Sequence, residues 1–249
     1  MEFTVRLADV NIAVKSLYDE VYTLCRGYLT DGAPDIEVVT APEDIDYERL
    51  VNVREAQIEG IAVVDYPVSY LETLAVYRRI VTGLLDSDIL LMHGAVVAVE
   101  DKAWLFTAPS GTGKTTHINL WLENIPGSYV VNGDKPLIRV ADGALSGPVV
   151  YGTPWAGKEG MNRNVGVRLC GIVILDRGQD NQIEQVSMSK VLPVLIQQSY
   201  RPRERQELQK TLALISRLGK TVPLYHLHCN MQPSAATVAY EALNRKNTQ

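Results

Sequence analysis

The chain has 249 residues, of which 46% are hydrophobic and 21% are charged, proportions that are ordinary for a globular protein with a sizeable core. The formal net charge of -5 provides no electrostatic basis for binding nucleic acid or an anionic membrane, so neither is expected as a partner. No apolar run reaches the length of about 18 residues that a membrane-spanning helix needs.

Cysteine usage and the first residues indicate the compartment. The three cysteines, Cys25, Cys170 and Cys229, are few and widely separated, which favours reduced, buried thiols over a disulfide framework. The opening residues MEFTVRLADV lack the basic and then apolar pattern of a secretion signal. We therefore expect a cytoplasmic protein.

Residues 1 to about 64 alternate short strand-like stretches with turn signals, the stretches being FTVRLADVNIAV, DGAPDIEVV, APEDID and GIAVVD. This pattern predicts a small α+β lobe, in which no chemical motif is evident. Residues 69–88 have apolar side chains at helical spacing, and Ser69 and Glu72 have the spacing of a capping box. We therefore expect a helix that begins near Ser69.

Two strand candidates follow, LLMHGAVVAV and AWLFTA, separated by the turn-like EDK. Because so short a connection can join antiparallel strands but not parallel ones, a hairpin is expected. The second strand runs directly into TAPSGTGKTTHINLWLE, which contains a glycine-rich loop and then apolar residues at helical spacing. The predicted order is strand, glycine-rich loop, helix.

The glycine-rich loop has the residues of a loop that holds a polyphosphate. Glycines allow backbone N–H groups to converge on phosphate oxygens, and the following helix adds the positive end of its dipole. Lys114 would reach the β and γ phosphates of ATP, and the Thr115 hydroxyl would bind Mg2+. Ala108 replaces the first glycine of the usual pattern, and a solvated glycine-rich turn is the alternative. The predicted nucleotide-binding residues are Pro109, Ser110, Gly111, Thr112, Gly113, Lys114, Thr115 and Thr116.

The rest of the chain continues to alternate strands and helices. SYVVNGDKPLIRV predicts a strand interrupted at Asn-Gly-Asp, and the Gly- and Pro-rich residues 141–164 predict turns and an extended functional loop. We then expect a buried strand in LCGIVILDRG, helices in SKVLPVLIQQSY and ERQELQKTLALISRL, a strand in VPLYHLHC and a closing helix in PSAATVAYEALN. The composite is an α/β fold.

The strand beginning HGAVVAV, followed by SGTGKTT, resembles the HPr kinase/phosphorylase and ATP-dependent phosphoenolpyruvate carboxykinase group. The resemblance covers about residues 90–176 and is closest to small serine kinases related to HPr kinase. It implies a nucleotide-binding core of mixed sheet flanked by helices, residues 89–249, behind an α+β lobe with a linking helix, residues 1–88. One continuous domain is the alternative. The resemblance also implies ATP and Mg2+ as cofactors and leaves a homo-oligomer open.

Individual residues match the motifs of that group by position. His93 matches a histidine beside the transferred phosphate, where it can donate to phosphate oxygens or relay a proton. Asp134 matches an acidic motif that holds Mg2+ and accepts the proton of the acceptor hydroxyl. The group usually has two successive aspartates, whereas this chain has Gly133 first, so Asp134 combines both roles or another group is the base. Lys158 and Arg163 are the cations expected to stabilise charge during transfer.

Each of these matches also has a structural alternative: a structural histidine, a plain Asn-Gly-Asp turn and a solvated loop. The favoured interpretation is an ATP-dependent kinase that phosphorylates a hydroxyl, in particular a serine of a small protein or peptide. A kinase for an amino acid or a sugar is a second interpretation. A nucleotide-binding regulatory module without turnover is the third, and Gly133 favours it.

Three potential metal ligands lie near the C-terminus. His226 and His228 would face the same side of a strand and Cys229 the opposite side. A metal site needs further ligands from elsewhere, and no residue in the sequence is recognisable as their partner. Metal binding is therefore not expected there.

Overall fold

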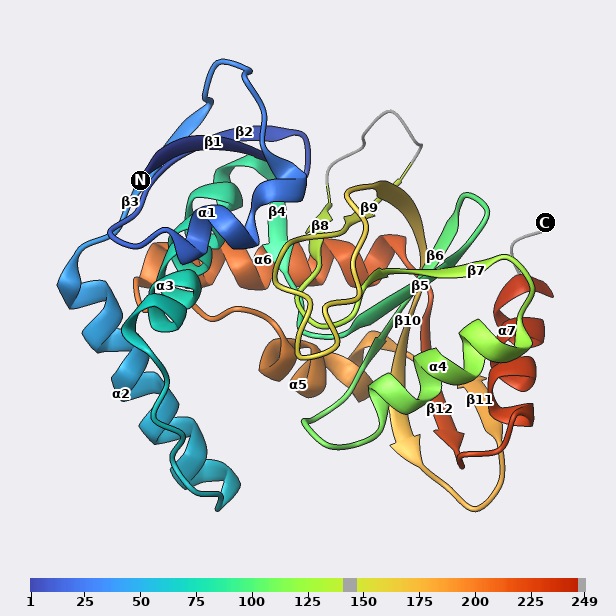
Figure 1. Ribbon diagram of the computed structural model, residues 1–249. Coiled ribbons are helices and arrows are strands. Elements are labelled where there is room, and N and C mark those ends of the chain that lie inside the picture. Colours follow the sequence, from blue (N-terminus) through green and yellow to red (C-terminus); the bar gives the residue numbers. More distant parts are fainter. Residues whose placement is uncertain (141–146, 246–249) are drawn as a thin grey trace. The chain divides into compact units, whose positions relative to one another are not determined.

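The computed structural model describes residues 1–140 and 147–245 and confirms the α/β class. The chain divides into two compact units, Met1–Leu84 and Leu85–Gln249 (Figure 1). Within the described ranges, no helix has both the length and the apolar character that crossing a membrane requires.

Among the described residues, the N-terminal unit contains a three-stranded sheet with helices. β1 and β2 form an antiparallel hairpin, and β3 pairs in parallel with β2. Alternate apolar residues of the hairpin, such as Val5 and Ile12, are fully buried, as the period of two requires. The elements are β1 (Glu2–Leu7), β2 (Val10–Lys15), α1 (Glu20–Leu24), a 3-10 turn (Arg26–Tyr28), β3 (Ile36–Val39), α2 (Pro42–Glu59) and α3 (Val68–Leu84).

The expectation of strand-like segments after β3 is wrong. The stretch that includes APEDID forms the long helix α2, and GIAVVD contains no strand. Pro42 occupies the first turn of α2, where its missing N–H costs nothing. The Asp44 carboxylate accepts a hydrogen bond from the backbone N–H of Ala41 at 2.9 Å, which secures the start of the helix.

The capping box expected at Ser69 is also wrong, although α3 does begin beside it. The Ser69 hydroxyl donates to the Glu20 carboxylate. Glu72 is fully buried and accepts hydrogen bonds from the N–H groups of Leu17 and Tyr18 at 2.6 and 2.8 Å. It also accepts one from the Thr40 hydroxyl at 2.6 Å. A buried carboxylate needs such donors, so tertiary contacts override the local cap.

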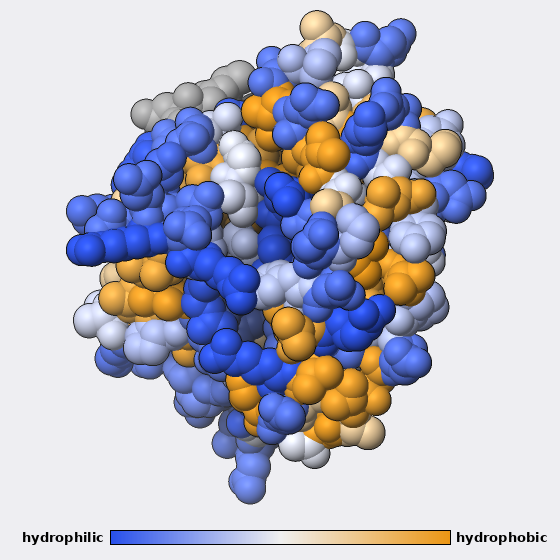
Figure 2. Space-filling view, turned by 90° about the vertical axis from the view of Figure 1, so that its left-hand side faces the viewer, coloured by the Kyte–Doolittle hydropathy of each residue, from blue (hydrophilic) through white to orange (hydrophobic). Residues whose placement is uncertain are grey.

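Several apolar side chains of the N-terminal unit are exposed at α2 and in the segment after it. They are Leu50, Ile58, Ile61, Val63 and Val64. Figure 2 shows apolar patches between hydrophilic side chains on the face that it presents. Exposed apolar surface is common at protein interfaces, and the homo-oligomer stays a prediction.

The C-terminal unit is built on a mixed sheet, which has nine strands within the described ranges. Its order is β4-β8-β9-β10-β6-β5-β7, and β12 pairs with β10 and with β11. The strands are β4 (Ile89–Leu91), β5 (Ala95–Val99), β6 (Lys102–Thr107), β7 (Ser128–Asn132), β8 (Leu137–Arg139), β9 (Val149–Tyr151), β10 (Gly166–Arg177), β11 (Gln182–Gln185) and β12 (Leu224–Cys229). The helices are a 3-10 turn (Leu85–Ser87), α4 (Lys114–Asn124), α5 (Met188–Gln198), α6 (Arg205–Thr221) and α7 (Ser234–Arg245).

The expected hairpin is confirmed, because β5 and β6 pair antiparallel. β6 also pairs in parallel with β10, and β10 pairs in parallel with β12. The carboxyl ends of these three strands therefore meet at one edge of the sheet, where ligands bind in open α/β sheets. Strands β9 and β11 were not expected from the sequence. The expected loop at residues 141–146 lies outside the described residues.

Each face of this sheet carries a hydrophobic core. Successive residues of β6 alternate between the cores: Leu105 packs in one and Trp104 and Phe106 in the other. The first core includes buried residues of α5 and α6, and the second includes those of α4 and α7 (Figure 1). Because both faces are covered, polar groups of the central strands reach solvent at the strand ends.

Candidate functional site

The glycine-rich loop joins the carboxyl end of β6 to the first residue of α4, which confirms the predicted order of strand, loop and helix. Gly111 and Gly113 have φ values of 74° and 121°, in the region that side chains other than glycine rarely adopt. Ser110, Thr115 and Thr116 are exposed. The N-terminus of α4 thus opens onto solvent beside a curled backbone, as an anion site requires.

The Lys114 side chain lies across the start of this loop. Its Nζ donates to the carbonyl oxygens of Ala108 at 2.9 Å and Pro109 at 3.2 Å. Burial lowers the pKa of the Lys114 ammonium, and the negative charge of Asp134 partly offsets that effect. The lysine and the aspartate are therefore close enough to interact, although they are 20 positions apart in sequence.

His93 and Asp134 form a direct pair next to the loop. His93 Nε2 lies 3.0 Å from Asp134 Oδ1, and the Gly94 N–H donates to the Asp134 carbonyl at 2.8 Å. The Thr107 hydroxyl donates to the His93 carbonyl at 2.7 Å, which ties the histidine to the last residue of β6. The structure thus brings together three of the predicted site residues: His93, Lys114 and Asp134.

Gln198, which the sequence did not suggest, holds the other side of the His93 ring. It is the last residue of α5 and is buried. His93 Nδ1 lies 2.8 Å from Gln198 Oε1, and the His93 N–H donates to the Gln198 carbonyl at 2.6 Å. The ring is therefore fixed between an amide and a carboxylate, so its orientation does not depend on a bound ligand.

The Asp134 carboxylate is ionised at neutral pH. Burial by itself raises its pKa, but the hydrogen bond to His93 and the positive charges of Lys135 and Lys114 outweigh burial, so the pKa lies below its ordinary value. The Asn132 side chain fixes the turn that carries it, since Oδ1 accepts from the N–H groups of Asp134 and Lys135 at 2.9 and 2.7 Å.

The backbone of residues 152–165 occupies the space next to Gly133. The Gly133 N–H donates to the Met161 carbonyl at 2.9 Å. A Cβ placed on Gly133 would lie 3.0 Å from the Ala156 carbonyl oxygen. Main chain thus crowds the Cβ position of Gly133, where the sequence resemblance implied an aspartate.

The two predicted cations of this segment differ in their surroundings. Lys158 is exposed, in a turn that follows Gly157, and a Cβ on Gly157 would lie 3.1 Å from the Asp134 Cβ. The Arg163 guanidinium lies over the Tyr129 ring, 4.5 Å from its centroid. The backbone next to Lys158 thus lies near Asp134, whereas the Arg163 side chain packs against that of Tyr129. The catalytic role of each stays a prediction.

Arg177, at the end of β10, is a further loop-binding residue that the sequence did not suggest. Its Nη2 donates to the Gly111 carbonyl at 2.6 Å and its Nε to the Thr112 carbonyl at 3.1 Å. In a planar trans peptide the carbonyl and the next N–H point in opposite directions. Arg177 therefore directs the N–H groups of Thr112 and Gly113 away from β10.

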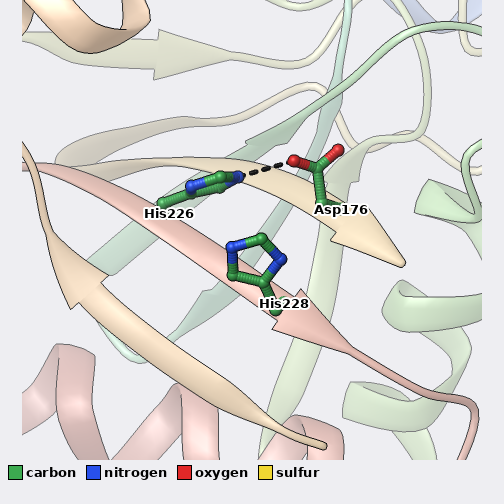
Figure 3. Close-up of side chains that lie close together, drawn as sticks. All are labelled: Asp176, His226 and His228. Atoms are coloured by element: carbon green, nitrogen blue, oxygen red, sulfur yellow. Dashed lines mark hydrogen bonds and ion pairs between the residues drawn. The ribbon is translucent and has the colours of Figure 1, made fainter. Parts of the chain in front are cut away.

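An open pocket of about 530 Å³ lies on the β10 side of the loop. It is lined by Ser110, Gly111, Thr112, Asp176, Arg177 and His228. Figure 3 shows His228 and His226 on β12, with Asp176 on the neighbouring strand. His226 Nε2 lies 2.7 Å from Asp176 Oδ2. The interpretation that the two histidines have no partner is therefore wrong, because the parallel pairing of β10 and β12 brings Asp176 to them.

Comparisons with known proteins give a distant similarity of fold. No family model matches the chain, and no curated protein matches it. Among solved structures, the chain is similar to the Hpr(Ser) kinase/phosphatase from Coxiella burnetii, at 12% sequence identity and a TM-score of 0.32. The match covers 63% of this chain and 92% of that chain. A similarity of this degree says nothing about activity, so the function has to be inferred from the geometry of the site.

Proposed function

We propose that this chain binds ATP at the glycine-rich loop and transfers the γ-phosphate to a hydroxyl, with a serine of a small protein or peptide as the acceptor. The observation that carries the proposal is the meeting of Lys114, Asp134 and His93 beside the loop. A curled loop at a helix N-terminus, a lysine and an ionised carboxylate are the parts that phosphoryl transfer from ATP requires.

Thr115 and Asp134 offer the kinds of ligand that a magnesium ion takes. Mg2+ prefers oxygen ligands, and these residues offer a hydroxyl on the exposed first turn of α4 and a carboxylate whose pKa is lowered. When bound, the ion would neutralise charge on the β and γ phosphates. Lys114 would stabilise the negative charge that develops on the leaving ADP.

The acceptor oxygen would attack the γ-phosphorus in line with the bond to the leaving oxygen. The new O–P bond forms while the bond to the oxygen between the β and γ phosphorus atoms breaks, and ADP leaves. The hydroxyl proton passes to the His93–Asp134 pair, whose geometry Gln198 maintains. Lys158, near Asp134, is proposed to contact the transferred phosphate, and Arg163 to do so after leaving Tyr129.

The test is transfer of label from γ-labelled ATP with Mg2+ to a panel of HPr, serine peptides, amino acids and sugars. We expect label on a serine hydroxyl with the wild-type chain and none with Lys114→Ala, whose circular dichroism should be unchanged. Lys102→Ala is the matched control, because Lys102 lies on β6 but bonds Asn244 instead of the loop. Full transfer by Lys114→Ala would refute the proposal.

The closed space at Gly133 supports a second candidate, a nucleotide-binding regulatory module without turnover. With no carboxylate at that position, Asp134 would have to serve both the metal and the proton, or another group would have to be the base. Calorimetry separates the candidates: ATP binding that Lys114→Ala removes, without transfer to any acceptor of the panel, would favour the regulatory module.

A further inference from the structure

A second group of polar side chains lies on the opposite side of the glycine-rich loop from His93 and Asp134. Asp176 is the register partner of His228 across the parallel pair β10 and β12, and His226 precedes His228 by two residues. Register partners and residues two apart on a strand face the same side of a sheet. The topology therefore places all three side chains on one face.

The distances within this group suit metal coordination. One potential ligand atom from each of Asp176, His226 and His228 lies within 4.8 Å of the other two. The two imidazole rings have centroids 4.3 Å apart, and the His226 Nε2 points at the Asp176 carboxylate (Figure 3). In zinc sites such atoms lie about 2.0 to 2.2 Å from the ion, so the three side chains would rotate toward a common ion on binding.

The chemistry of the three ligands selects the class of ion. Two imidazole nitrogens and one carboxylate suit zinc, cobalt or nickel, whereas magnesium and calcium prefer oxygen ligands alone. The Arg177 guanidinium donates to the loop carbonyls, and no ion pair joins it to Asp176 among the described residues. Asp176 therefore provides the negative charge that the ion needs.

The group is also accessible. The side chains of His226 and Asp176 are 26% and 49% exposed, and His228 is exposed. Asp176 and His228 line the pocket next to Ser110, Gly111 and Thr112. Three protein ligands leave at least one coordination position open, and that position would face this pocket.

We propose that Asp176, His226 and His228 bind one divalent ion of the zinc, cobalt and nickel class beside the glycine-rich loop. The open position would take water or an oxygen of an anionic group bound in the pocket. This site is separate from the magnesium site proposed at Thr115 and Asp134, and its occupancy does not depend on kinase activity.

The experiment uses the tag-free, metal-depleted full chain without nucleotide. Titration with Co2+, followed by visible absorption, should give the d–d bands of nitrogen and oxygen ligation, saturating at one ion per chain, without a thiolate charge-transfer band. Calorimetry with Zn2+ should give the same stoichiometry. His228→Ala and Asp176→Asn should each lower the affinity for Co2+ and for Zn2+ by about tenfold or more.

His93→Asn is the matched control, because it alters the other histidine–aspartate pair and should leave Co2+ binding unchanged. His228→Gln keeps the size and polarity at an exposed position, so loss of binding there with unchanged circular dichroism cannot come from misfolding. The proposal is overturned if the wild type binds less than one ion, if the His228 variants bind like wild type, or if His93→Asn removes the ion. If Lys114→Ala loses phosphoryl transfer but still binds Co2+, the metal site is shown to be independent of the proposed kinase activity.

Discussion

The Arg177 guanidinium donates a hydrogen bond of 2.6 Å to the carbonyl oxygen of Gly111, at the tip of the glycine-rich loop. A side chain from β10 thereby controls the orientation of peptide groups that follow β6, the neighbouring strand. The loop is shaped by the sheet next to it as well as by its own glycines.

Replacing Arg177 by Gln should weaken ATP binding, because the peptide groups of the loop, and with them the Gly113 N–H that is proposed to face the phosphates, lose their fixed direction. A hydrogen bond contributes about 1 kcal/mol to stability or binding. We therefore expect the Kd for ATP to rise about three- to tenfold, which corresponds to the loss of roughly one such bond. Calorimetry with ATP and Mg2+ measures it. Arg177→Lys keeps the positive charge but cannot donate two hydrogen bonds from a planar group, so its Kd should lie between those of the wild type and Arg177→Gln. An unchanged affinity in Arg177→Gln would contradict the proposed role of Arg177 in orienting the loop.

Introducing by Gly133→Asp the aspartate that the sequence resemblance implies should destabilise the protein and not improve turnover. The added Cβ would meet the Ala156 carbonyl at 3.0 Å and the Met161 carbonyl at 3.4 Å. Overpacking of this kind costs about 1 to 3 kcal/mol. Thermal unfolding measures the loss, and Gly133→Ala separates crowding from charge, since both variants should lose stability. Higher kcat in Gly133→Asp with an unchanged Tm would show that the loop yields readily.

Gln198 is expected to act as a positioning residue for His93. Gln198→Met keeps the volume of this buried side chain but removes the group 2.8 Å from Nδ1. We expect kcat of the proposed transfer to fall by about tenfold or more, because a freely turning imidazole no longer holds the Asp134 carboxylate in position to accept the proton. The KM for ATP should stay the same. Gln198→Glu retains an acceptor and should retain more activity than the Met variant; equal rates in all three proteins would disprove the role.

Removing the buried carboxylate of Glu72 should destabilise the N-terminal unit. Glu72→Ala leaves the N–H groups of Leu17 and Tyr18 and the Thr40 hydroxyl without their acceptor. The Thr40 donor is buried and the two N–H groups are partly buried. A buried donor without a partner costs about 1 to 3 kcal/mol, so we expect a loss of about 3 kcal/mol in the free energy of unfolding. Urea unfolding measures it. Glu55→Gln, at an exposed position of α2, should change stability by less than about 0.5 kcal/mol.

The cysteines should be unreactive in the folded protein. All three lie in the described ranges, unbridged and buried. Burial raises the pKa of Cys25 to about 12 and that of Cys229 to about 11, and it also raises the pKa of Cys170. A thiol reagent at neutral pH should label none of them within minutes and all of them in denaturant. Rapid labelling of Cys229 in the native state would indicate that the end of β12 opens.

Features of the fold that depend on neighbouring residues could be predicted from the sequence. Features that depend on contacts between distant parts of the chain could not. The β5–β6 hairpin was predictable because so short a connection can join only antiparallel strands. The start of α4 was predictable because the glycines adjoin apolar residues at helical spacing. Helix α2 was missed, since its apolar residues form no stripe and several of them, including Leu50 and Ile58, are exposed. The capping box predicted at Ser69 and Glu72 was wrong because the hydrogen-bond partners of both residues lie far away in the sequence.

The sequence alone identified the strand before the glycine-rich loop, the loop itself, Lys114 and Thr115, because a short run of adjacent residues forms this motif. Only the tertiary structure joined His93 to Gln198, 105 positions away, and His226 to Asp176, 50 positions away. Such pairs depend on which elements lie side by side and, for the strands, in which register they pair. The packing of the whole sheet decides that register, and no short stretch of chain contains it.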